Sequence, residues 1–126
     1  MRVFDASAVL AFVFDEPGGD KAVRLLDDDI AAISAVNLAE VVTRLVERGF
    51  APEDVDAICA GLRLEVLPFT EEAAVASGKL RAATRALGLS LGDRCCLAAA
   101  QAHGAEVVTA DRPWKALKGF RFTFIR

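Results

Sequence analysis

Short β-type runs and longer segments of helical periodicity alternate along the chain. The short runs predict five strands, at about 2–4, 30–33, 64–67, 105–110 and 120–125. The longer segments predict six helices, at about 6–14, 20–26, 35–48, 52–62, 70–87 and 93–103, with a short helical piece after residue 111. Strands that alternate with helices predict an α/β fold in which helices flank both sides of a mostly parallel β-sheet.

The length and the charge of the chain limit the number of domains and the kinds of function that it can have. A chain of 126 residues, 54% of them hydrophobic, is large enough for one domain with its own core, which we expect to span residues 1–126. The formal net charge of −3 provides no overall basic field, so passive binding of nucleic acid is disfavoured. The same charge is compatible with an enzyme that brings a divalent metal to a phosphate.

The cysteines and the apolar segments indicate the compartment. Cys59, Cys95 and Cys96 lack zinc-site spacing, and two of them are adjacent, which is poor geometry for a disulfide. We expect all three to be reduced core residues. The chain opens with no charged leader and long apolar run, and no segment reaches the ~18 apolar residues of a membrane span. These features favour a cytoplasmic protein that does not contact a membrane.

The segment from Ser90 to Asp111 predicts that two acidic side chains meet. A helix of about 11 residues, opened by Ser90 and Asp93 and ended by Gly104, is roughly 16 Å long. The following strand returns over roughly 15–20 Å. Because the two lengths nearly cancel, we expect Asp93 and Asp111 at the same end of the unit.

Two further acids are expected at the same place. Asp5 ends the first strand and Asp111 ends a later one, and ligands of open α/β sheets bind beyond the carboxyl ends of the strands. Glu40 lies in the second turn of a helix that itself follows a strand, so it can reach this edge. An exposed ion pair with Arg44, four residues later, is the alternative explanation for Glu40.

Four carboxylates without a cysteine or histidine cluster favour Mg²⁺ or Mn²⁺ over zinc. Carboxylates placed this closely repel one another unless a cation offsets them. Such a site supports the hydrolysis of phosphodiesters. We assign no chemistry to His103, which is expected at the far end of its helix, or to the acidic run at 27–29, which is typical of a solvated turn.

Four short motifs carry these acids: V-F-D-A-S at 3–7, S-x-x-N-L-A-E-V at 34–41, L-S-L-G-D-x-x-x-L-A at 89–98 and V-T-A-D at 108–111. These motifs resemble those of the PIN-domain ribonucleases, and the chain length and the order of the acids most resemble the VapC-type toxins of bacterial and archaeal toxin–antitoxin pairs. They occur in order over essentially the whole chain. The resemblance implies a PIN-like fold, a metal-dependent endoribonuclease that acts as the toxin of a type II pair, homodimerisation, and a cognate antitoxin that blocks the site.

The resemblance also implies roles for the acids. Asp5, Glu40, Asp93 and Asp111 match the four acidic positions of the family site. Asp5 and Asp93 are expected as direct ligands of Mg²⁺ or Mn²⁺. Glu40 and Asp111 would complete the shell, directly or through water, and help to orient the attacking hydroxide.

The remaining site candidates are hydroxyls and cations near the acids. Ser7 and Thr109 match hydroxyl positions that brace the acids, although Ser7 is equally well explained as the cap of the first helix. Arg94 departs from the small or apolar residue that is common after the third acid, and it either contacts the RNA backbone or the antitoxin or lies on the helix surface. Arg112 and Lys115 are further candidates for phosphate contacts.

Trp114 is interpreted as a buried anchor for the last segment, with stacking on an RNA base as the alternative. The apolar helices at 7–14 and 35–46 are either ordinary core or a surface for a second copy or an antitoxin helix.

Two other classes of function fit the sequence less well. A catalytically weak PIN-fold module that holds RNA or a protein partner would not need a complete acid set, yet all four acids are present. A phosphotransfer protein of the receiver or haloacid-dehalogenase type is disfavoured because Ser7 stands where such a phosphatase has a second aspartate, and no aspartate ends a mid-chain strand.

Overall fold

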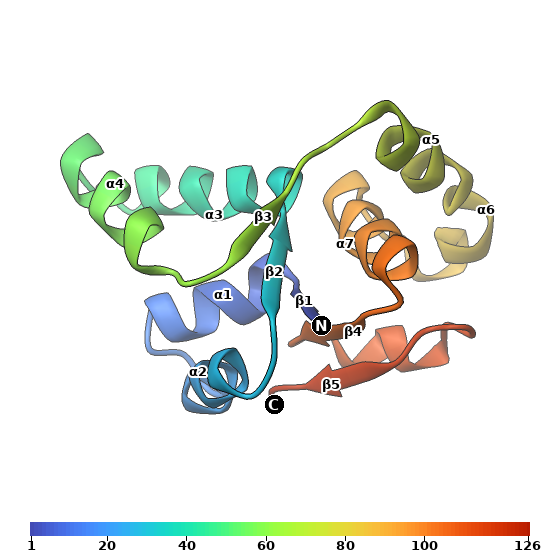
Figure 1. The fold of residues 1–126 in the computed structure, drawn as a ribbon, viewed down its shortest axis with the longest axis horizontal. Helices are drawn as coiled ribbons and strands as arrows, with labels where there is room; N and C mark the ends of the chain where they lie inside the picture. Colours follow the sequence, from blue (N-terminus) through green and yellow to red (C-terminus); the bar gives the residue numbers. More distant parts are fainter.

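The computed structural model describes all 126 residues and contains one five-stranded sheet with helices against both faces (Figure 1). The strands are β1 (Arg2–Phe4), β2 (Ala31–Ser34), β3 (Glu65–Leu67), β4 (Glu106–Thr109) and β5 (Phe122–Phe124). The helices are α1 (Ala6–Val13), α2 (Gly19–Asp27), α3 (Ala35–Glu47), α4 (Pro52–Gly61), α5 (Glu71–Lys79), α6 (Arg81–Thr84) and α7 (Leu91–His103), with 3₁₀ turns η1 (Arg85–Leu87) and η2 (Arg112–Ala116). The predicted α/β class is confirmed.

The order of the strands reverses at β1. Across the sheet the order is β3-β2-β1-β4-β5, and every neighbouring pair is parallel. The chain therefore builds outward from β1 through β2 to β3, and then returns to the other side of β1 for β4 and β5. In open parallel sheets, such a reversal opens a crevice at the carboxyl ends of the two central strands. Here that crevice lies beyond β1 and β4.

The strands contribute side chains alternately to two cores, because successive residues of a strand face opposite sides of the sheet. The first core lies under α1 to α4 and receives Phe4, Ala31, Ile33 and Val108 from the strands. The second lies under α7, η1 and η2 and receives Val3, Ala32, Leu67 and Val107. In Figure 1, α5 and α6 lie on the outer side of α7, so this half of the molecule has one more helical layer.

The helices begin and end at residues that the sequence marks. The hydroxyls of Ser34, Thr70 and Ser90 each accept a backbone N–H of the first turn of the following helix. At Ser90 the bond is reciprocal, because the carboxylate of Asp93 accepts the backbone N–H of Ser90 at 2.9 Å. Gly104 ends α7 in a left-handed conformation, with φ of +59°.

The prediction of one helix over 70–87 is wrong, because this segment divides into α5, α6 and η1. Gly78 weakens the helix near its break. The hydroxyls of Ser77 and Thr84 donate to the carbonyls four residues before them, Ala73 at 2.7 Å and Leu80 at 2.8 Å. Such bonds compete with the helical ladder and bend helices.

The last strand is shorter than the predicted 120–125, because β5 pairs only where the four-residue β4 lies beside it. Its aromatic face packs on η2: the ring of Phe122 lies 6.3 Å from that of Trp114 and 5.5 Å from that of Phe124. Trp114 is 2% exposed. The interpretation of Trp114 as a buried anchor is confirmed.

The cysteines are free, as predicted, with Cys95 and Cys96 buried and Cys59 half-buried. None of the helices combines the length and the hydrophobicity needed to cross a bilayer. The helices at 7–14 and 35–46 contribute mainly to the first core, through Ala8, Val9, Ala11, Val41 and Leu45. Val46 is an exception, with 60% of its surface exposed.

Candidate active site

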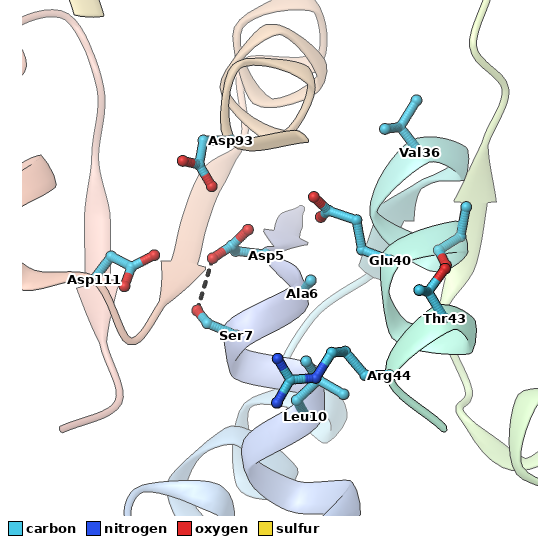
Figure 2. A pocket seen from close by; sticks show the side chains of 11 residues that line it. Asp5, Ala6, Ser7, Leu10, Val36, Glu40, Thr43, Arg44, Asp93 and Asp111 are labelled. Carbon is cyan, nitrogen blue, oxygen red and sulfur yellow. Dashed lines mark hydrogen bonds between the residues drawn. The ribbon is translucent and has the colours of Figure 1, made fainter. Parts of the chain in front are cut away.

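All four predicted acids line one pocket of about 520 Å³ at the carboxyl ends of β1 and β4 (Figure 2). Asp5 follows β1 directly and Asp111 lies two residues beyond β4. Glu40 comes from the second turn of α3, and Asp93 from the first turn of α7. The length argument for the segment from Ser90 to Asp111 therefore placed its two acids correctly. Figure 2 shows the carboxylates of Asp5, Asp93 and Asp111 pointing toward one another.

Asp5 is the most buried of the acids, with 3% of its surface exposed. Two hydroxyls donate to the same carboxylate oxygen, Oδ2: that of Ser7 at 2.7 Å and that of Thr109 at 3.1 Å. Ser7 does not cap α1, because Asp5 occupies the cap position and Ser7 is the second residue of the helix. Of the two interpretations of Ser7, the structure favours the brace.

The same hydroxyls also receive backbone N–H groups from the loop after β4. Ala110 donates to Ser7 Oγ at 3.0 Å, and Asp111 donates to Thr109 Oγ1 at 3.1 Å. These bonds tie the loop that carries Asp111 to the start of α1. The positions of Asp5 and Asp111 are therefore linked through two short side chains.

Asn37 holds Glu40 in place. This fully buried side chain donates one amide bond to Glu40 Oε2 at 2.9 Å and another to the backbone carbonyl of Gly92 at 2.9 Å. Its own oxygen accepts the hydroxyl of Ser34. Asn37 thus connects the end of β2, the carboxylate of Glu40 and the first turn of α7. No ion pair forms between Glu40 and Arg44, so the alternative explanation of Glu40 is not supported.

Gly92 provides the space that Glu40 occupies. A Cβ atom at Gly92 would overlap Oε1 of Glu40. The residue before Asp93 therefore has to lack a side chain for Glu40 to keep this position. Only a glycine allows α3 and α7 to bring these two acids to one pocket in this arrangement.

The electrostatics of the pocket are unbalanced. Burial raises the pKa of Asp5 to about 7; the hydroxyl bonds from Ser7 and Thr109 oppose this rise, and the charges of Asp93 and Asp111 add to it. Burial also raises the pKa of Asp111, and the charge of Asp93 adds to the effect. None of the four acids forms an ion pair with a lysine or arginine. The pocket therefore favours a cation or protons.

The donor set suits a hard divalent cation. Four carboxylates line the pocket and no cysteine or histidine does, a composition that favours Mg²⁺ or Mn²⁺. As the side chains stand, no three acidic, cysteine or histidine side chains are arranged to hold one ion together. Binding would therefore require small side-chain rotations, for which the half-buried Asp93 and Asp111 have room.

The three predicted cations lie outside this pocket. Arg94 turns toward α5 and donates to the backbone carbonyl of Ser77 at 3.1 Å. Arg112 is exposed, donates to the carbonyl of Arg126 at 3.1 Å, and its guanidinium lies 5.5 Å from the centre of the Phe124 ring. Lys115 is exposed on η2. Contact of any of them with RNA remains a prediction.

The residues that we assigned no chemistry are also elsewhere. His103 lies at the end of α7, on the wall of a different pocket that is lined by α5 and α7. Asp27 and Asp28 are exposed and lie near Arg63 and Arg2 respectively, while Asp29 pairs with the N-terminal ammonium. These carboxylates are balanced by cations, unlike those of the site.

Sequence reasoning missed the positioning roles of Asn37 and Gly92. The spacing of three between Ser34, Asn37 and Glu40 places all three on one side of a helix start, and it could have indicated the relay. Nothing in the sequence indicated that Gly92 faces Glu40. The effect of Arg126, whose charge opposes part of the rise in the pKa of Asp111, was also not anticipated.

Comparisons with known proteins agree with this geometry. The PIN domain family matches residues 2–119. No curated protein matches significantly in sequence. A chain of a DNA-bound VapBC from Salmonella typhimurium has 24% identity and a TM-score of 0.75, and the match covers 99% of this chain and 98% of that one.

Two further solved structures extend the comparison. A chain of a toxin–antitoxin complex from Klebsiella pneumoniae has 19% identity and a TM-score of 0.76, with 100% and 98% of the two chains covered. The Mycobacterium tuberculosis toxin VapC20, described as cleaving the sarcin–ricin loop, has 18% identity and a TM-score of 0.72, with 95% and 96% covered. At these identities the structures show a shared fold. The family match, which spans all four acids of the pocket, shows that this chain belongs to the PIN domain family.

Proposed function

We propose that this protein is a Mg²⁺- or Mn²⁺-dependent endoribonuclease that acts as the toxin of a toxin–antitoxin pair. One observation carries the proposal: four carboxylates from four separate segments converge on one pocket, and none of them forms an ion pair within the chain. The family membership and the likeness to chains of toxin–antitoxin complexes support it.

The residues of the chain divide the work as follows. Asp5 and Asp93 would bind the metal, and Glu40 and Asp111 would complete its shell, directly or through water. Ser7 and Thr109 keep the carboxylate of Asp5 oriented. A bound divalent metal supplies Lewis-acid polarisation of the phosphodiester and lowers the pKa of water.

The alternative is a PIN-fold module that holds RNA or a protein partner and cleaves weakly. It is favoured by one observation, that no three acids are arranged to hold an ion as they stand. Calorimetric titration with Mn²⁺ separates the two proposals. Absence of binding at millimolar Mn²⁺ would favour the module.

We further propose that the chain forms a homodimer and binds a cognate antitoxin in the cytoplasm. Light scattering after size exclusion is expected to give twice the mass of one chain at micromolar concentration. A monomer under these conditions would contradict the dimer.

Substitution of Asp93 by Asn is expected to abolish cleavage of RNA, because the neutral amide weakens metal binding. An asparagine oxygen can still accept the N–H of Ser90, so α7 keeps its cap. Initial rates with Mn²⁺ should fall more than about 100-fold, since even indirect partners of metal ligands typically account for 10–100-fold. The matched control is Asp56→Asn on exposed α4, with an unchanged rate. Undiminished cleavage by Asp93→Asn would show that Asp93 is not a residue of the active site.

Substitution of Asp5 by Asn is expected to stabilise the metal-free protein at high pH. Folding raises the pKa of Asp5 from 3.8 to about 7. The contribution of Asp5 to the free energy of unfolding is therefore fully present below pH 4 and is lost as the pH rises through 7. The variant avoids this loss. In EDTA, its advantage in the free energy of unfolding should widen by roughly 2–3 kcal/mol between pH 5 and pH 8, at 1.36 kcal/mol per pKa unit.

Denaturant unfolding at both pH values measures this difference, and Asp56→Asn again serves as the control. Added Mn²⁺ is expected to stabilise the wild type and not Asp5→Asn, because a ligand stabilises only the state that binds it. A pH-independent difference between wild type and variant would show that Asp5 is not held at raised pKa.

Substitution of Gly92 by Ala is expected to reduce cleavage while the protein stays folded. The new Cβ displaces the carboxylate of Glu40, the flexible end of a side chain, so the fold can adjust while the site cannot. A displacement of about 1 Å at a catalytic group can lower the rate up to 100-fold. The control is Gly78→Ala on α5, where no atom lies within 4 Å of the added Cβ. Equal rates for the two variants would contradict the role of Gly92.

A further inference from the structure

Arg44 is the one cationic side chain in the wall of the pocket that holds the four acids. It is exposed, and its guanidinium takes part in no hydrogen bond or ion pair within the chain. Glu40, four residues earlier on the same helix, accepts a hydrogen bond from Asn37 and forms no ion pair with Arg44. Figure 2 shows the guanidinium extending from α3 across toward α1, beside Leu10 and away from the cluster of acids.

The other arginines near the pocket are committed to contacts within the fold. Arg48, which follows the last residue of α3, lies over the Phe14 ring at 4.2 Å. Arg94 and Arg126 donate to backbone carbonyls of Ser77 and Pro17. Arg44 thus remains available to an anion that enters the pocket.

The pocket changes character along α3. The four acids lie at one end and Arg44 at the other. On α1 the lining runs from Ala6, next to Asp5, to Leu10, which lies beside Arg44 (Figure 2), whereas Val36 lies beyond Glu40 on the side away from Arg44. Four residues of helix correspond to about 6 Å, so Arg44 lies roughly that far along the axis from Glu40. The apolar side chains of Ala6 and Leu10 on this side of the pocket suit a nucleotide whose sugar or base lies against α1, between a phosphate at the acids and a phosphate at Arg44.

An RNA strand needs such a cation to enter this pocket. Four carboxylates repel a polyanion, and a metal at the acids offsets the repulsion only at the scissile phosphate. A guanidinium further along offsets it at a second phosphate, which it can bind with two parallel hydrogen bonds.

We propose that Arg44 binds the RNA phosphate next to the one that is cleaved and so fixes how the strand lies across the acids. This inference rests on the proposed ribonuclease function. It makes Arg44 a substrate-binding residue with no part in metal binding.

The test compares wild type, Arg44→Ala, Arg44→Lys and Arg48→Ala, which removes the same charge from the end of the same helix. Wild-type protein is first incubated with total cellular RNA and Mn²⁺, and the new RNA ends are sequenced. A labelled oligonucleotide with the cleaved sequence then gives KM and kcat for all four proteins at several KCl concentrations.

Arg44→Ala is expected to raise KM about tenfold, as for the loss of one charged hydrogen bond, with kcat within about threefold. Loss of one phosphate contact should also make the slope of log kcat/KM against log salt shallower by about 0.7–1, which a structural defect would not do. Arg44→Lys should retain the slope, and Arg48→Ala should resemble wild type.

The ribonuclease function and the role of Arg44 are contradicted by different results. If the wild type cuts no RNA at any metal concentration, the ribonuclease function falls and this inference with it. If the wild type cuts RNA but Arg44→Ala has the wild-type KM and salt slope, the function stands and the inference is overturned, which would leave Arg44 available for a carboxylate of a protein partner. Equal losses for Arg44→Ala and Arg48→Ala would also overturn it.

Discussion

The reversal of strand order at β1 is the constraint on which the rest of this structure depends. It leaves a crevice beyond the ends of β1 and β4, and there the chain buries the carboxylate of Asp5. A buried carboxylate is costly unless it is hydrogen-bonded or balanced by a cation. The hydroxyls of Ser7 and Thr109 meet part of that cost and, because they come from α1 and β4, they join the two sides of the crevice.

The remaining acids are held by bonds that also define the secondary structure. Asp93 belongs to the reciprocal cap that begins α7, and Glu40 is held by Asn37, which itself takes part in the cap of α3 with Ser34. Residues that take part in the helix caps therefore also orient the carboxylates. This economy explains how a chain of 126 residues can carry a four-carboxylate site without a long loop.

The sequence was sufficient for those parts of the fold and site that depend on local pattern. Strand and helix order followed from periodicity, and the meeting of Asp93 with Asp111 followed from the nearly equal lengths of α7 and the returning strand. The break in the helix after Lys79 did not follow, because side-chain bonds to the backbone compete with a pattern that is otherwise helical. The contact of Gly92 with Glu40 depends on the packing of α3 against α7, which no local pattern encodes. The alternative pairing of Glu40 with Arg44 rested on spacing alone, and it does not form, because the buried amide of Asn37 donates to that carboxylate.

The hydrogen bonds at the site engage only one oxygen of each of three carboxylates. Asp5 and Asp93 each accept bonds through Oδ2, and Glu40 accepts through Oε2, so that one oxygen of each carboxylate is engaged by the protein. The second oxygen of each has no partner within the chain. An engaged oxygen fixes the plane of a carboxylate, and a partnerless one can serve as a single-oxygen ligand. Mg²⁺ is usually bound through one or two carboxylates and keeps several waters. As the side chains stand, no three of them are arranged to hold one ion together. A cation in this pocket would therefore depend on rotation of the partnerless oxygens toward it, while the bonds to the engaged oxygens limit how far each carboxylate has to turn.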